Sequence, residues 1–285
     1  MSDDRFHSEF VPQWCPGCGN FELLDCVRQA LADLYEPHEV ILAIGIGQTA
    51  KLGFSIRANL FNGLHGRTLP LAMGIRMANK DAKILVVAGD GDLFAEGGNH
   101  FIHAMRRNLN VTVLLGDNRV YALTKGQGAP TSNLDFRAHL HRDGKPPRSI
   151  TPTALALVTG ATFVAKSFSG NQQELTDLLK AGLQHRGMAL IDTMFPCVSF
   201  NRVNTLAWYK ERVKAIGPDH DTGNFEAAMQ LSTANNDDTI YTGLYYREER
   251  TIYTDLFPAL DGEPLVKRAQ EWRPERVEGL FAGFR

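Results

Sequence analysis

Two stretches of the chain decide its fold: AKILVVAGDGD, residues 82–92, and NVTVLLGDNRVY, residues 110–121. Each begins with a run of apolar, largely β-branched residues and ends in a turn that contains glycine and aspartate. Continuous apolar runs of this length are typical of strands that are buried on both faces of a parallel sheet. We therefore predict two buried strands with polar groups at their carboxyl ends.

Other segments complete the pattern. Three further apolar runs are predicted strands: EVILAIGIG (39–47), ATFVAKSF (161–168) and MALIDTMF (188–195). Predicted helices lie between the strands, at residues 21–35, 69–80, 97–109 and 171–185. This alternation predicts a doubly wound, mostly parallel α/β sheet with helices on both faces.

The domain organisation follows from the same pattern. Residues 1–200 are predicted to form one α/β domain that includes an N-terminal Cys-x-x-Cys segment. After residue 200 the periodicity weakens, so residues 201–285 are predicted to be a less regular extension that packs on this domain or on a partner subunit. The segment 119–152 is rich in glycine, proline and basic residues, which indicates a long functional loop.

The composition excludes several classes of protein. The chain has 285 residues, of which 22% are charged, and a net charge of −2, so no basic excess indicates nucleic-acid binding. No apolar run approaches the roughly 18 residues that a membrane span needs. The N-terminal residues are acidic and lack the apolar core of a signal peptide. We expect a cytoplasmic protein, in which a Cys-x-x-Cys motif indicates metal or redox chemistry.

The ends of the two opening strands predict a metal site. Ligands of doubly wound sheets bind beyond the carboxyl ends of the strands, where Asp90 and, 28 residues later, Asn118 are expected. Mg²⁺ prefers oxygen ligands, typically one or two carboxylates together with phosphate oxygens and water. Asp90, Asn118 and the carbonyl of Val120 are the predicted ligands. GDG alone is also compatible with a simple tight turn, but its spacing from DNRVY favours magnesium and a diphosphate.

The same motifs resemble those of a known family. A GDG motif followed by Asn resembles the thiamine diphosphate (TPP) enzymes, and WCPGCGNFELL, HGRTLPLAMGIRMAN and the segment 89–132 are similar to the β subunit of two-subunit 2-oxoacid:ferredoxin oxidoreductases. The resemblance covers roughly residues 12–210. It implies the diphosphate-binding half of a TPP site and one [4Fe–4S] cluster. The implied reaction is the coenzyme A-dependent oxidative decarboxylation of a 2-oxoacid to an acyl-CoA and CO₂, reversible to reductive carboxylation.

The resemblance also implies partners. Electrons are expected to pass through the cluster to ferredoxin. TPP enzymes need a glutamate that activates the cofactor, and in this family the pyrimidine-binding domain of the α subunit supplies it. One chain of this size contains one diphosphate domain. We therefore expect an obligate α subunit, an α2β2 assembly, and no activity of this chain alone.

Site residues follow from the resemblance. Cofactor contacts are expected from the strand ends and their loops: Gly47, His65, Gly89, Asp90, Gly91, Asp92, Asn118, Tyr121, Leu123 and Thr124. Three residues are expected at the substrate. His65 is placed near the reacting atoms, Leu123 in a loop over the cofactor, and Lys51 in the substrate pocket. A cation at Lys51 suits a second carboxylate, which favours 2-oxoglutarate over pyruvate, although a surface or diphosphate-contacting lysine stays an alternative.

Three cysteines match the cluster pattern of the family: Cys15, Cys18 and Cys197. The fourth position, in the turn after the first strand, is occupied by Gln48. Cys26 lies in an apolar predicted helix and is interpreted as a small core residue. The cluster then keeps a non-cysteine fourth ligand or an open iron, degrades to a three-iron form, or is absent.

Other functions stay open at this point. A cluster-free TPP decarboxylase or synthase subunit would use the same magnesium site, and a structural zinc protein would use Cys15 and Cys18. A Rossmann-type regulatory protein finds no support, because GIGQTAKLG after the first strand lacks the G-x-G-x-x-G pattern.

Overall fold

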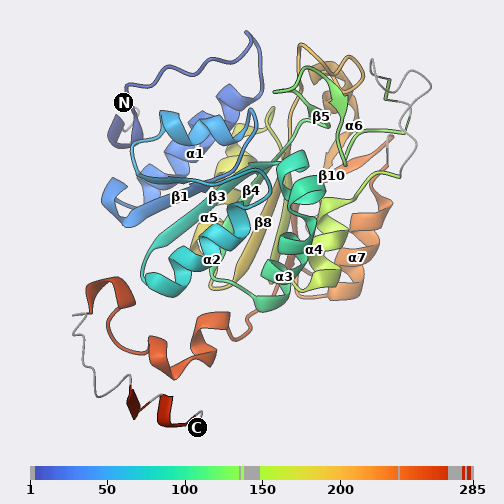
Figure 1. Cartoon of the computed structure of the whole chain (residues 1–285). Helices are drawn as coiled ribbons and strands as arrows, with labels where there is room; N and C mark the ends of the chain where they lie inside the picture. Colours follow the sequence, from blue (N-terminus) through green and yellow to red (C-terminus); the bar gives the residue numbers. More distant parts are fainter. Residues whose placement is uncertain are drawn as a thin grey trace.

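An eight-stranded sheet forms the centre of the described part of the chain. The structure is a computed structural model, and it describes residues 4–134, 136–137, 148–236, 238–268, 278–279 and 281–283. The strand order is β2-β1-β3-β4-β8-β7-β10-β9. Figure 1 labels β1, β3, β4, β8 and β10 across the sheet in this order. The strands are β1 (Val40–Ile44), β2 (Asn59–Asn62), β3 (Lys83–Gly89), β4 (Val111–Asp117), β7 (Phe163–Phe168), β8 (Met188–Met194), β9 (Val213–Ala215) and β10 (Ile240–Arg247). The strands from β2 to β7 in this order are parallel, and β10 runs antiparallel to β7. The predicted α/β fold with a mostly parallel sheet is confirmed.

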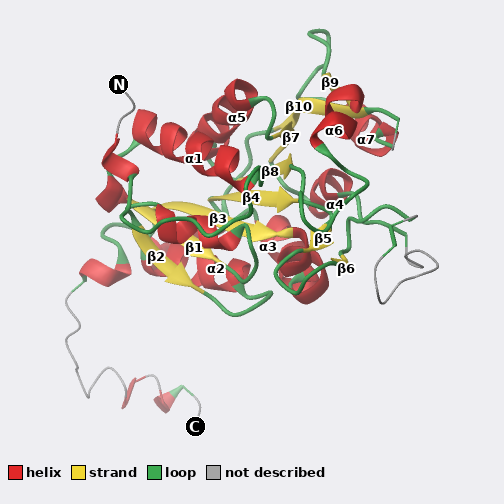
Figure 2. Cartoon of the chain, turned by 90° about the horizontal axis from the view of Figure 1, so that it is seen from above, coloured by secondary structure: helices red, strands yellow, loops and turns green. Residues whose placement is uncertain are grey.

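Helices cover both faces of the sheet (Figure 2). On one face α1 (Asn20–Leu34) packs beside α5 (Gln172–Gln184). The other face carries α2 (Thr68–Ala78), α3 (Gly98–Arg107), α4 (Pro152–Thr159) and α7 (Phe225–Ala234). A shorter helix, α6 (Leu206–Arg212), precedes β9. The four helices predicted from the sequence correspond to α1, α2, α3 and α5.

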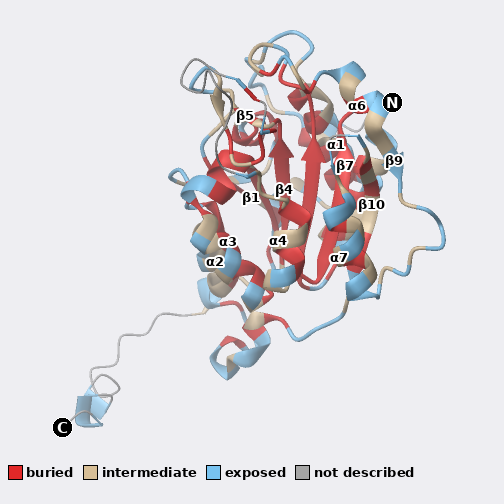
Figure 3. Ribbon diagram, turned by 90° about the vertical axis from the view of Figure 1, so that its right-hand side faces the viewer, coloured by how far each residue is buried: buried red, intermediate tan, exposed pale blue. Residues whose placement is uncertain are grey.

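The central strands contribute to two apolar layers, which explains their uninterrupted apolar sequence (Figure 3). In β3, Leu85 and Val87 join the layer under α1 and α5, whereas Ile84 and Val86 join the layer under α2 and α3. Alternate residues of a strand point to opposite faces, so burial on both sides requires apolar residues at every position. Burying each such side chain stabilises the fold by about 1.5–3 kcal/mol.

Strand β10 is an element that the sequence analysis missed. It pairs with β7, and its Tyr245 is fully buried. The register shifts between Leu244 and Tyr246, and β10 also contains half-exposed positions, so it lacks the continuous apolar run from which the other strands were predicted. Beyond β10 the chain reaches the short helix η7 (Leu265–Lys267), which contacts α2. The domain boundary at residue 201 stays a prediction, as does packing of residues 201–285 on a partner.

The parallel strands bring several loops to one edge of the sheet. The carboxyl ends of β1, β3, β4 and β8 all lie there, because neighbouring parallel strands point the same way. A two-stranded ribbon, β5 (Val120–Tyr121) with β6 (Gln127–Gly128), follows β4. Residues 135 and 138–147 of the predicted functional loop lie outside the described residues. Among the helices that the structure describes, none has the length and apolarity of a membrane span.

Candidate active site

The three predicted magnesium ligands lie together at this edge. Asp90, which follows β3, and Asn118, which follows β4, line one cavity together with Val120. The Asp90 carboxylate accepts hydrogen bonds from the Gly91 N–H at 2.9 Å and from the Thr131 hydroxyl at 2.5 Å. The side-chain oxygen of Asn118 accepts one from the Val120 N–H at 3.0 Å. Their oxygens therefore keep lone pairs that a cation can use.

Two neighbouring buried carboxylates, Asp90 and Asp117, favour the binding of a positive charge at this cavity. The Thr131 hydroxyl lies within hydrogen-bond distance of both the Asp90 and the Asp117 carboxylates, at 2.5 and 2.7 Å, but its single proton serves only one of them. Burial, and secondly the nearby Asp117, raises the pKa of Asp90 to about 8. A divalent cation stabilises the ionised carboxylate, and carboxylate and amide oxygens are the donors that Mg²⁺ prefers. The residues present thus fit a magnesium ion, and its ligand set stays a prediction.

The second glycine of the GDG motif, Gly91, is explained by an aromatic ring. A Cβ atom at Gly91 would lie 2.2 Å from Cε1 of Tyr121, closer than any side chain tolerates. The glycine-aspartate turn and the tyrosine of DNRVY therefore form one contact. Between them Arg119 adopts a left-handed backbone with φ 58°, and strained non-glycine residues of this kind cluster at functional sites. The spacing between the two motifs reflects a real three-dimensional contact.

Asp92 connects three segments of the chain: its own turn after β3, the loop after β1 and the loop that leads into α2. The residue is 2% exposed, and its carboxylate accepts hydrogen bonds from the N–H of Ile46 at 3.2 Å, the N–H of Gly66 at 2.8 Å and the hydroxyl of Thr68 at 2.8 Å. The same carboxylate lies 2.7 Å from Nδ1 of His65. Asp92 thus holds the imidazole of His65 at the cavity, and its own oxygens are engaged by protein donors.

All ten predicted cofactor contacts line this one cavity: Gly47, His65, Gly89, Asp90, Gly91, Asp92, Asn118, Tyr121, Leu123 and Thr124. Lys51 is different. It lies half-buried in the short helix η3 (Ala50–Ser55) and lines neither this cavity nor the one that contains the cysteines. The roles of all these residues toward cofactor and substrate stay predictions. The cavity also includes residues that the sequence analysis did not assign to it: Ile46, Gln48, Thr49, Gly116 and Ala122.

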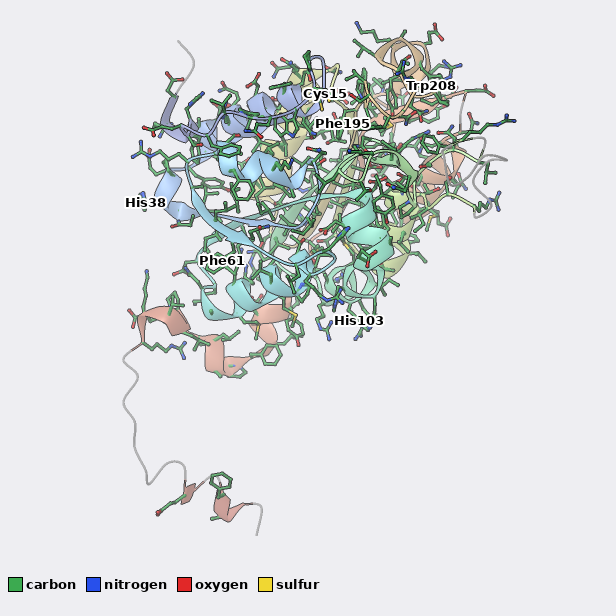
Figure 4. The ribbon with its side chains drawn as sticks, turned by 45° about the horizontal axis from the view of Figure 1, so that its top comes forward. Cys15, His38, Phe61, His103, Phe195 and Trp208 are labelled. Atoms are coloured by element: carbon green, nitrogen blue, oxygen red, sulfur yellow. The ribbon has the colours of Figure 1, made fainter. Side chains whose placement is uncertain are left out.

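A second cavity contains the cysteines. Cys15, Cys18 and Cys197 line it, and Figure 4 shows Cys15 beside Phe195, which lines it too. The Ser199 hydroxyl donates to Sγ of Cys15 at 3.0 Å, and the Asn20 amide donates to Sγ of Cys18 at 3.6 Å. Burial raises the pKa of Cys18, and the neighbouring Cys197 and Cys15 raise it further.

Both an iron–sulfur cluster and a single zinc ion take cysteine thiolates as ligands. In the part of the chain that the structure describes, no three His, Cys, Asp or Glu side chains converge tightly enough to hold one metal ion. A [4Fe–4S] cluster is held by cysteines on separate iron atoms, so its thiolates lie further apart than around one zinc ion. Cys15, Cys18 and Cys197 supply three thiols to one cavity, which is the ligand type of an iron–sulfur cluster, and the cluster itself stays a prediction. Cys26 is 3% exposed in the core under α1, as predicted.

The two cavities share a wall. Gln48, Asn118 and Ala122 line both of them. The indole N–H of Trp14 donates to the backbone carbonyl of Gln48 at 3.0 Å, which ties the cysteine segment to the loop after β1. A group bound at Asp90 and a group bound at the cysteines would be separated by a single layer of residues.

Comparisons with known proteins agree with this geometry. The family model described as thiamine pyrophosphate enzyme, C-terminal TPP binding domain, matches residues 45–193, and the model of the C-terminal part of the pyruvate ferredoxin oxidoreductase beta subunit matches residues 197–262. The chain is 41% identical over 202 residues to subunit beta of 2-oxoacid:ferredoxin oxidoreductase 2 of Aeropyrum pernix, which covers 70% of this chain and 65% of that protein. A Sulfolobus 2-oxoacid:ferredoxin oxidoreductase subunit beta is 40% identical over 228 residues, covering 74% of this chain and 72% of that protein.

A solved structure is similar over almost the whole chain. It is 2-oxoglutarate:ferredoxin oxidoreductase from Magnetococcus marinus with 2-oxoglutarate, coenzyme A and succinyl-CoA bound. The TM-score is 0.91 at 32% identity, and the match covers 98% of this chain and 96% of that chain. The fold, the position of the TPP-binding domain and these relatives lead to one conclusion: the chain belongs to the β subunits of the 2-oxoacid:ferredoxin oxidoreductases.

Proposed function

We propose that this chain binds the diphosphate half of TPP and carries an iron–sulfur cluster in a 2-oxoacid:ferredoxin oxidoreductase. The observation that supports the proposal most strongly is the wall shared by the two cavities, one with Asp90 and Asn118 and the other with three cysteines. Oxidative decarboxylation needs a site that accepts the electrons of the reaction next to the site where carbon bonds break. One layer of residues between the two cavities meets that need.

The residues of the first cavity have distinct tasks. When bound, TPP supplies the electron sink for decarboxylation of a 2-oxoacid. Asp90, Asn118 and the Val120 carbonyl would hold Mg²⁺ and through it the diphosphate. His65, fixed through Nδ1 by Asp92, would face the substrate. Leu123 is 42% exposed on the loop that lines the cavity, where it would cover the bound cofactor and exclude water.

The three cysteines would hold a [4Fe–4S] cluster that passes electrons to ferredoxin. Thiolates are the usual ligands of such clusters, and hydrogen bonds to the sulfurs tune their potentials. Ser199 and Asn20 provide donors of this kind to Cys15 and Cys18. The acyl group would leave with coenzyme A as co-substrate, so the products are an acyl-CoA and CO₂.

The favoured substrate is 2-oxoglutarate. The Magnetococcus relative is described with 2-oxoglutarate and succinyl-CoA bound. A Mycobacterium tuberculosis relative is named 2-oxoglutarate oxidoreductase subunit KorB. It is 41% identical over 197 residues, which cover 69% of this chain and 53% of that protein. Lys51 is the residue of this chain proposed to attract the second carboxylate. It would have to reach the substrate from η3, three residues beyond Gln48.

The first cavity needs an α subunit to complete it. Leu64 and Leu123 are 77% and 42% exposed, and His65 and Leu123 line the cavity, so apolar surface is open at its entrance. The pyrimidine-binding domain of an α subunit would cover this entrance and supply the activating glutamate, in an α2β2 assembly. A cytoplasmic location is part of the same proposal.

The test is an anaerobic assay of the complex. The chain is co-expressed with its α subunit, and reduction of ferredoxin is followed with 2-oxoglutarate, coenzyme A, TPP and Mg²⁺. We expect activity that requires every component and is absent from this chain alone. Decarboxylation of 2-oxoglutarate without reduction of an acceptor would refute the redox function, and a preference for pyruvate would refute the choice of substrate.

A further inference from the structure

Gln48 has a buried side-chain oxygen without a partner. Its Oε1 atom is inaccessible to solvent and makes no hydrogen bond among the described residues. A buried amide oxygen normally finds a donor, so each exception calls for an explanation such as a bound ion. The backbone of Gln48 is held by Trp14, whose side-chain N–H bonds its carbonyl, and the residue lines the cysteine cavity. The unpaired oxygen therefore belongs to a residue fixed beside three thiols.

We propose that Gln48 is the fourth ligand of the iron–sulfur cluster, bound through Oε1 to the iron that Cys15, Cys18 and Cys197 leave without a thiolate. The inference rests on the cluster in the proposed function and extends it. A [4Fe–4S] cluster commonly takes four protein ligands, and the cavity offers three cysteines. The amide oxygen of Gln48 is a neutral donor, harder than a thiolate and therefore a weaker ligand for the fourth iron.

A neutral fourth ligand changes the charge of the cluster. Replacing a thiolate by an amide oxygen removes one negative charge from the cluster and its ligands in each oxidation state. The added electron then meets less repulsion, so the reduction potential is higher than with four cysteines. A cluster with a higher potential accepts electrons from the substrate more readily and donates them less readily. Gln48 would thus bias the site toward oxidative decarboxylation over carboxylation.

The weaker ligand also makes one iron distinct. The iron bound to Gln48 is held by an exchangeable oxygen donor, whereas the other three are held by thiolates. When a one-electron oxidant such as ferricyanide removes an electron from the [4Fe–4S]²⁺ cluster, this iron should leave first as Fe²⁺, which leaves a [3Fe–4S]⁺ cluster. Two of the outcomes left open by the sequence, a non-cysteine fourth ligand and a three-iron form, are then states of one site.

The experiment compares four versions of the full chain, purified anaerobically and reconstituted with iron and sulfide: wild type, Gln48→Ala, Gln48→Cys and Gln13→Ala. Gln13 is the matched control, because it lines the same cavity but is exposed. Iron and sulfide are counted per chain, EPR spectra are recorded before and after mild oxidation, and reduction potentials are measured by EPR-monitored titration. Thermal unfolding checks that each variant is folded.

The expected results are specific. Gln48→Ala should lose the fourth iron as Fe²⁺, and it should need less ferricyanide than wild type and Gln13→Ala to show the signal of the oxidised three-iron cluster. Gln48→Cys should keep four irons through oxidation, and its potential should fall below that of wild type. The role of Gln48 alone would be overturned if Gln48→Ala had the iron content and spectra of wild type. Equal reduction potentials in wild type and Gln48→Cys would overturn it too. Iron-free wild type and Gln48→Cys would instead overturn the cluster of the proposed function.

Discussion

Replacing Asp92 by alanine should cost the fold at least about 2 kcal/mol. The carboxylate accepts hydrogen bonds from two backbone N–H groups and one hydroxyl, those of Ile46, Gly66 and Thr68, and its side chain is 0% exposed. A buried donor left without an acceptor costs about 1–3 kcal/mol, and alanine leaves two of them, the Gly66 N–H and the Thr68 hydroxyl, because the Ile46 N–H is only partly buried. Asp92→Asn keeps one acceptor oxygen, so its cost should be smaller.

The assay is urea unfolding at pH 7 without cofactors, followed by far-UV circular dichroism. The control is Asp177→Ala, because Asp177 lies on the exposed face of α5 and pairs with Lys180 in water. Exposed ion pairs of this kind contribute about 0–1 kcal/mol. If Asp92→Ala lowers the free energy of unfolding no more than Asp177→Ala does, Asp92 does not hold the three segments together, and the positioning of His65 through it is wrong.

The remaining predictions concern packing, pH and substrate. Gly91→Ala drives a Cβ into the Tyr121 ring and should cost about 1–3 kcal/mol in urea unfolding, so an unchanged midpoint would contradict the contact. Burial lowers the pKa of His185 from 6.5 to about 4, so protonation favours the unfolded chain and stability should fall as the pH drops from 6.5 toward 4. His185→Gln should make the melting temperature depend less on pH, whereas His38→Gln, at an exposed position, should keep the pH dependence of wild type. The same pH dependence in wild type and both variants would exclude His185 as its source. Lys51→Ile in the complex should lower kcat/KM for 2-oxoglutarate relative to pyruvate by at least about tenfold, because an ionic contact of about 1.5–3 kcal/mol is lost; an unchanged ratio would rule out a substrate contact.

Much of the fold was predictable because its signals are local. The apolar runs of β1, β3, β4, β7 and β8 are continuous in sequence, since both faces of each strand are buried. Strand β10 was not predictable in this way, because its bulge and half-exposed positions break the pattern. Its place beside β7 depends on pairing between segments more than 70 residues apart.

Part of the candidate site could likewise be predicted from the sequence, and part of it could not. The amino-acid pattern alone was enough to assign Asp90 and Asn118 to strand ends, because the carboxyl ends of parallel strands share one edge, whereas the cysteines were grouped by the family resemblance. The folded chain was needed to find that Asp92 connects three segments, and that Gln48 stands between two cavities with its side-chain oxygen unpaired. Strand formation follows from the local alternation of side chains, whereas burial and hydrogen-bond partners depend on which distant loops the sheet brings together.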